Sequence, residues 1–109
     1  MAKVRAMELI LDPEKFDEHQ AIFIAEMVKK IKIKLQEAGL KEEDVPTLTA
    51  NIAFSIASII DDTSAVEHDD VEGRPYLTFR TEDDRLIHCG ENAYTYEHVF
   101  GVLRSLFDE

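Results

Sequence analysis

The sequence predicts a single α+β domain with the element order (β)-α-α-β-β-α, in which a small antiparallel sheet packs on helices in two layers. Two long segments repeat apolar residues with helical spacing, and a third such segment ends the chain. Between them, two short alternating segments flank a compact turn. A chain of 109 residues with 45% hydrophobic and 32% charged residues fits one folded domain, so we treat residues 1–109 as one unit.

The first segment, residues 4–11, is compatible with two structures. Its apolar residues alternate as in a short strand, but a helical turn fits nearly as well. Asp12 and Pro13 then predict a helix start, because aspartate is a preferred N-cap and proline is tolerated in the first turn. The predicted helix runs to about Ala38, with Gly39 as the residue that ends it.

One face of this first helix is apolar over an arc of about 140° and predicts its contact with the core. The arc contains Phe16, Phe23, Ile24, Met27, Val28, Ile31, Leu35 and Ala38. Ile22 and Ile33 lie on the opposite side, flanked by charged residues. Because symmetric dimers are the commonest oligomers, we predict a homodimer that pairs through Ile22 and Ile33.

The second helix is predicted from Val45 to about Ile60, and none of its residues is charged. Its large apolar residues form a main stripe, and its alanines form a second stripe that lets another helix approach closely. The main stripe is Val45, Leu48, Ile52, Ile56 and Ile59, and the alanines are Ala50, Ala53 and Ala57. A helix without a charged face is typically buried on most sides, so we expect it at the centre of the fold or in a subunit interface.

Residues 61–73 predict a loop, because six of them are acidic and none is lysine or arginine. Residues 76–89 then predict a hairpin with a three-residue turn at 82–84. A turn of odd length places Phe79 opposite Ile87 and gathers the apolar side chains on one face. The last helix is predicted from Thr95 to about Phe107.

The charge is strongly negative, with 12 Lys and Arg against 23 Asp and Glu, a net charge of −11. The whole excess lies after residue 40. Such a surface repels phosphate backbones and anionic lipids, so we predict no direct nucleic-acid binding and no membrane binding. It favours a basic partner protein instead. The densest acidic clusters, which we predict to contact that partner, are Asp69 and Asp70 in the loop and Glu82, Asp83 and Asp84 in the turn.

A metal site is the alternative hypothesis. His68, Asp69 and Asp70 are adjacent and offer the imidazole and carboxylate ligands that divalent cations use. A distant ligand such as His88 or His98 would have to complete the site. This pattern is typical of a metal-binding protein or a metal-dependent enzyme, but an acidic loop exposed to water explains it as well.

Cys89 has two interpretations. As a nucleophile it would need a base, such as His98 or His68. The hairpin register turns it towards the core instead, where cysteine packs as a small hydrophobic residue. A single cysteine also forms no internal disulfide, and with no recognisable targeting or membrane-spanning segment we expect a cytoplasmic protein.

The glycines are too widely spaced for a phosphate-binding loop or a dinucleotide fingerprint, and we predict no cofactor and assign no catalytic residue. The leading hypothesis is a non-catalytic protein-interaction module, regulatory or inhibitory, that acts through its acidic surface.

Overall fold

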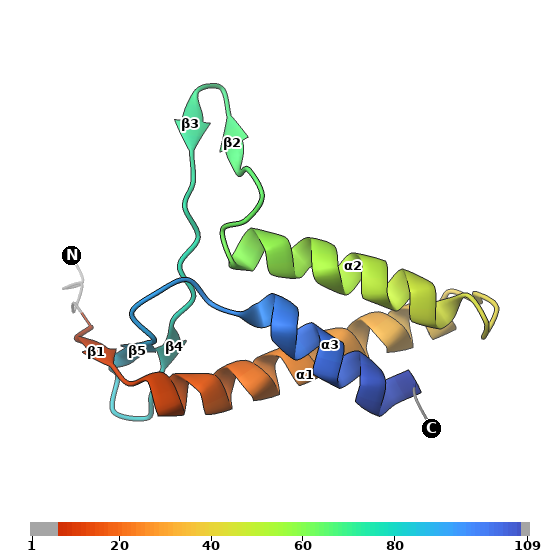
Figure 1. The fold of residues 1–109 in the computed structure, drawn as a ribbon, viewed down its shortest axis with the longest axis horizontal. Helices are drawn as coiled ribbons and strands as arrows, with labels where there is room; N and C mark the ends of the chain where they lie inside the picture. The colour runs from red at the N-terminus through yellow and green to blue at the C-terminus, as the bar shows by residue number, and fades with distance from the viewer. Residues whose placement is uncertain (1–6, 108–109) are drawn as a thin grey trace, which may run out of the picture.

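The computed structural model describes residues 7–107, so the predictions for residues 4–6 lie outside the described part. The fold is α+β, as predicted: three helices pack against one another, and a small sheet lies at one end of them (Figure 1). The helices are α1 (Pro13–Glu37), α2 (Val45–Ile60) and α3 (Thr95–Phe107). The sheet consists of β1 (Leu9–Leu11), β5 (Leu86–His88) and β4 (Phe79–Arg80), in that order. A separate hairpin of β2 (Glu67–His68) and β3 (Val71–Glu72) projects away from the helices.

Helix α1 begins and ends where the sequence predicts. The Asp12 side chain caps it by accepting the backbone N–H of Lys15, at 3.1 Å. At the other end Gly39 has a φ of +83°, which a glycine adopts without strain. The N–H of Leu40 donates to the carbonyl oxygen of Leu35 at 3.3 Å, which closes the last turn.

The sheet has the predicted hairpin register and one additional strand. Phe79 lies opposite Ile87, and Asp84 in the three-residue turn has a positive φ of +58°. Strand β1 pairs parallel to β5, with Ile10 opposite Ile87. Of the two structures predicted for residues 4–11, the strand is therefore correct for Leu9–Leu11. The sheet is mixed, whereas a purely antiparallel sheet was predicted.

The inner face of the sheet packs on α1 through aromatic rings. The Phe79 ring lies 5.3 Å from that of Phe16 and 5.8 Å from that of Phe23, measured between centroids. Phe16 and Ile87 are buried in this contact region. The alternation predicted for the hairpin thus determines which side of the sheet meets the helix.

The expectation that residues 61–73 form only a loop is wrong for its second half. Strands β2 and β3 make a hairpin, and Asp69 and Asp70 form its two-residue turn, with φ values of +47° and +65°. Two positive φ angles are required by the tight turn that matches the twist of a hairpin. Aspartate tolerates this conformation because its short side chain bonds locally, which allows the turn without glycine.

The stripe of α2 that faces the core also differs from the prediction. Its buried residues are Val45, Thr49, Ala53 and Ala57, whereas Leu48, Ile52 and Ile59 of the main stripe are exposed. Ala53 and Ala57 share one buried cluster with Ile24, Val28 and Val99. Three helices that all touch at one centre need small side chains there, so the alanine stripe takes the interior and the larger stripe faces out.

Thr49 is a polar residue in this core. It is fully buried, and its hydroxyl group has no hydrogen-bond partner. An unsatisfied buried hydroxyl costs stability because it loses its bonds to water without replacing them. Thr49 is therefore a site where an apolar residue of equal shape fits better.

We predict that Thr49→Val increases the free energy of unfolding by about 1 kcal/mol, since the unpaired hydroxyl is replaced by a methyl group. Chemical denaturation monitored by circular dichroism measures the change. Thr47→Val is the matched control, because Thr47 is exposed on the same helix and has no such penalty to relieve. If Thr49→Val instead lowered the free energy of unfolding by as much as the truncation of a core side chain, the Thr49 hydroxyl could not be an unpaired group.

Candidate functional site

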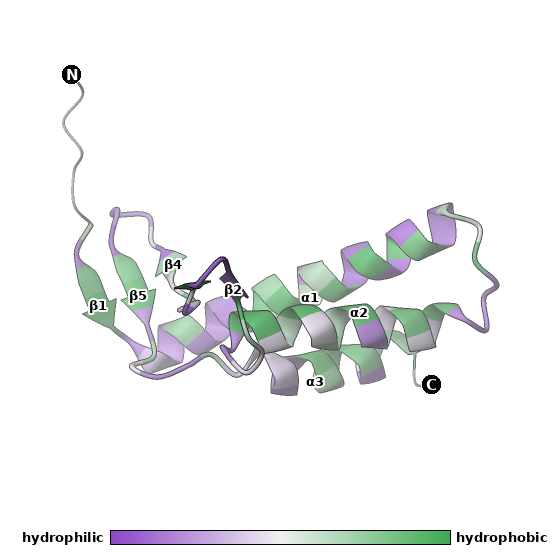
Figure 2. Ribbon diagram, turned by 90° about the horizontal axis from the view of Figure 1, so that it is seen from above, coloured by the Kyte–Doolittle hydropathy of each residue, from purple (hydrophilic) through white to green (hydrophobic). Residues whose placement is uncertain are grey.

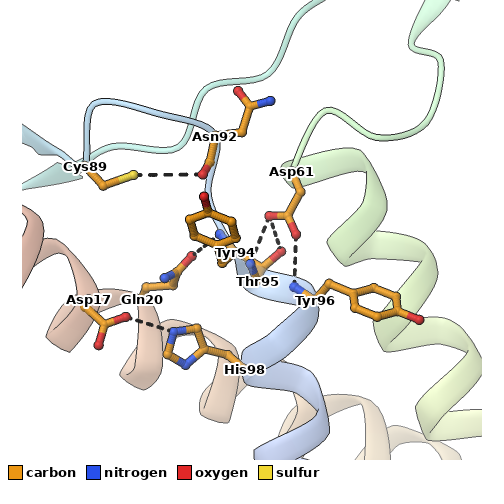
Figure 3. A network of polar contacts seen from close by, with 9 residues as sticks. All are labelled: Asp17, Gln20, Asp61, Cys89, Asn92, Tyr94, Thr95, Tyr96 and His98. Atoms are coloured by element: carbon orange, nitrogen blue, oxygen red, sulfur yellow. Dashed lines mark hydrogen bonds and ion pairs between the residues drawn. The ribbon is translucent and has the colours of Figure 1, made fainter.

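The start of α3 is held by side chains from both other helices (Figure 3). Asp61, just after α2, is buried with 5% of its surface exposed, and its carboxylate accepts the backbone N–H groups of Thr95 and Tyr96, each at 3.0 Å. The Thr95 hydroxyl donates to the same carboxylate at 2.6 Å. Gln20 of α1 accepts the N–H of Tyr94 at 3.0 Å through Oε1.

This arrangement satisfies two demands at once. The first N–H groups of a helix have no partner within it, and the positive end of the helix dipole favours an anion. A buried carboxylate in turn needs several hydrogen bonds to compensate for lost hydration. Asp61 meets both demands, and it joins the end of α2 to the start of α3 across 34 residues of sequence.

A hollow of about 590 Å³ opens beside this junction. It is lined by Asp61, Thr63, Glu91, Asn92, Ala93, Tyr94, Tyr96 and Glu97. The Glu91 carboxylate next to Tyr94 raises the pKa of the Tyr94 hydroxyl group. Tyr94 and Tyr96 are exposed, so their rings are accessible to a bound group.

The lining residues favour one class of ligand. They include three carboxylates and two tyrosines, and none of them is lysine or arginine. Carboxylates pair with ammonium and guanidinium groups, and aromatic rings attract the same cations. The hollow therefore has the chemistry to hold a lysine or arginine side chain.

The predicted loop residues Asp69 and Asp70 lie at the tip of the projecting β2–β3 hairpin, and both are exposed. His68 Nε2 is 3.2 Å from Asp69 Oδ2, and both side chains are highly exposed. The structure therefore brings two of the three proposed metal ligands together. Among residues 7–107, no group of three His, Cys, Asp or Glu side chains is positioned to hold a metal ion.

The two histidines proposed as distant ligands have other partners. The Tyr76 hydroxyl is 2.6 Å from Nδ1 of His88, beside the sheet. His98 Nε2 lies 3.0 Å from a carboxylate oxygen of Asp17, and this contact joins α3 to α1. Neither imidazole is directed to the β2–β3 hairpin.

Two of the three acidic residues in the turn at 82–84 have arginine partners. Arg80 Nε lies 3.0 Å from Asp84, and Arg85 Nε lies 3.3 Å from Asp83. A hydrogen bond from the Thr81 hydroxyl lowers the pKa of Asp83. This turn and the β2–β3 hairpin also lie apart, at opposite ends of the segment that connects them (Figure 1).

Ile22 and Ile33 lie on the solvent side of α1, as predicted, with 67% and 40% of their surfaces exposed. Their pairing with a second copy remains a prediction.

Cys89 is half-buried, so the expectation of a fully buried core residue is wrong. Its thiol is 3.0 Å from the backbone carbonyl oxygen of Glu91, to which it donates. The bond ties the end of β5 to the loop before α3. His98, one of the two bases proposed for it, pairs with Asp17 instead.

Comparisons with known proteins give no match to a family model, a curated protein or a solved structure. Among residues 7–107, no helix has an apolar stretch long enough to cross a bilayer.

Sequence reasoning missed Asp61 and Gln20, although one signal was present. Asp61 directly follows an uncharged helix, and a carboxylate at a helix C-terminus is unfavourable for that helix. Its presence there indicates a bond to another group. The sequence does not reveal which group, because Thr95 is distant along the chain.

We predict that Asp61→Ala lowers the free energy of unfolding by about 3 kcal/mol, because it leaves buried N–H groups at the start of α3 without acceptors. Asp61→Asn restores one acceptor oxygen and should lose less. Urea denaturation measures both variants against Glu82→Ala, which removes an exposed carboxylate. Equal stability of Asp61→Ala and the control would contradict the role assigned to this side chain.

Proposed function

We propose that this protein is a non-catalytic interaction module, regulatory or inhibitory, that binds a basic protein through its acidic surface. The observation that carries the proposal is the hollow beside α3, whose lining contains Glu91, Glu97 and two exposed tyrosines but no basic residue. A lysine or arginine side chain of the partner enters this hollow. The partner's remaining charges are attracted over longer range by the net charge of −11.

The β2–β3 hairpin is the second contact in this proposal. Its tip projects from the body of the protein, and Asp69 and Asp70 are exposed there. Exposed charges of this kind mainly increase the rate of association, whereas a side chain held in a hollow slows dissociation. We assign the turn at 82–84 a smaller part, because Asp83 and Asp84 already pair with arginines.

The proposal includes a homodimer and a cytoplasmic setting. The exposed Ile22 and Ile33 support self-association through α1. The free thiol of Cys89 suits a reducing compartment.

We predict that Glu91→Gln with Glu97→Gln weakens capture of basic partner proteins from a lysate of the source cells by about tenfold, because it neutralises the hollow. Asp69→Asn with Asp70→Gly should slow association, and asparagine–glycine preserves the tight turn. Capture is quantified by mass spectrometry at about 50 mM and about 500 mM salt, since salt screens charge attraction.

Glu42→Gln with Glu43→Gln is the control, because it removes the same charge from the exposed connection between α1 and α2. Loss of capture in the hollow variant alone supports the proposal. Equal loss in the control would show that only net charge matters, and capture that no variant changes would also contradict the proposal.

A further inference from the structure

A cluster of three aromatic rings lies on α2 and α3, which are side by side in both ribbon views (Figures 1 and 2). The Phe54 ring is 4.6 Å from that of Tyr96 and 4.7 Å from that of Phe100, measured between centroids. The rings of Tyr96 and Phe100 are 5.4 Å apart. At these distances aromatic rings attract one another, so this aromatic cluster has a defined shape.

Two of the three rings are open to solvent. Tyr96 is 47% exposed and Phe100 is 51% exposed, whereas Phe54 is half-buried. An aromatic side chain has about 150–250 Å² of surface, so these two leave on the order of 200 Å² uncovered. Packed aromatic side chains with an open surface are typical of the core of a protein interface, where apolar side chains of a partner cover them.

The aromatic cluster is continuous with the acidic hollow. Tyr96 belongs to both, because it lines the hollow and its ring contacts that of Phe54. Figure 3 shows the Tyr96 ring extending from the start of α3 towards α2. Phe100 follows Tyr96 by four residues, which is about one turn or about 6 Å along a helix. An acidic site and an apolar site therefore lie one helical turn apart on the same face of α3.

The charges around the aromatic cluster favour one arrangement of a bound segment. Glu97 lines the hollow at the start of α3, and Arg104 is exposed one turn beyond Phe100. Helix α2 adds no charge, because none of its residues is acidic or basic. A basic side chain is therefore attracted to the hollow and repelled from the far end of the cluster, which leaves the rings for an apolar side chain.

We propose that the basic partner binds through a helix that carries a lysine or arginine and, one turn away on the same face, a large apolar side chain. The basic residue enters the hollow, and the apolar residue packs on Tyr96 and Phe100. The inference rests on the proposed function, because it takes the hollow as the site of the basic residue. It adds the residue pattern by which the partner is recognised, and this pattern distinguishes the partner from proteins that are merely basic.

A helix fits this surface better than an extended segment does. Helices α2 and α3 use their backbone groups within themselves and present side chains on their common face. An extended segment gains its affinity from backbone hydrogen bonds to a sheet edge, which this face lacks. A helix satisfies its own backbone groups and places residues four positions apart on one side, at the spacing of the two sites.

Two capped helical peptides of identical composition test the pattern. Both consist of about 18 residues, alanine and glutamine with one arginine and one leucine, which is long enough to form a helix. The leucine follows the arginine by four residues in the first peptide and by two in the second, so only the first presents both on one face. Titration of isotope-labelled protein monitored by NMR should show about tenfold tighter binding of the first peptide, with shifts at the amides of Glu97 and Phe100.

Three single variants test the aromatic cluster itself. Phe100→Gln should reduce the affinity for the first peptide by about tenfold, to that of the second, because it removes the exposed ring without changing the charge. Phe100→Leu keeps an apolar surface and should restore most of the affinity. Ile59→Gln is the matched control, since Ile59 is exposed and lies about 140° around α2 from Phe54. Circular dichroism verifies that each variant is folded.

Equal affinity of the wild-type protein for the two peptides would overturn the inference, as would equal losses in Phe100→Gln and Ile59→Gln, or binding of neither peptide. The double variant Glu91→Gln with Glu97→Gln separates this failure from that of the proposed function. If it loses two peptides that the wild type binds equally, the hollow holds the arginine and the aromatic cluster adds nothing. If it binds both as well as the wild type does, the proposed role of the hollow is contradicted, and the inference with it.

Discussion

The buried carboxylate of Asp61 fixes the position of α3, and the rest of the fold depends on that position. It joins the end of α2 to the first two N–H groups of α3, while Gln20 of α1 bonds the residue before them. Three helices thus meet at one polar junction. With α3 held there, Val99 reaches the cluster that contains Ala53 and Ala57, and the helices approach closely enough to exclude water.

The same junction shapes the surface that we assign to partner binding. The loop from β5 to α3 is tied by the Cys89 thiol at one end and by Asp61 at the other, and the hollow lies along it. Its tyrosines are therefore presented on a fixed backbone. The projecting β2–β3 hairpin lies outside this junction, so it is a second candidate contact surface apart from the hollow.

The sequence predicts features that depend on neighbouring residues. Asp12 and Gly39 mark the ends of α1 through local capping, and the parity of the turn determines that Phe79 faces Ile87. Features that depend on distant residues were not predictable. The periodicity of α2 identifies two stripes of apolar residues, but it does not show which stripe faces the other two helices. No local signal links Asp61 to Thr95. The β2–β3 hairpin was not predicted, because its tight turn consists of two aspartates and contains no glycine.

Amide hydrogen exchange at the start of α3 tests the central role of Asp61 most directly. The N–H groups of Thr95 and Tyr96 belong to the first turn of a helix, where amides normally exchange quickly because they lack helical partners. Bonded to a buried carboxylate, they should exchange as slowly as amides in the middle of α3, and Asp61→Ala should abolish that protection. Rapid exchange of both amides in the wild-type protein would contradict this account.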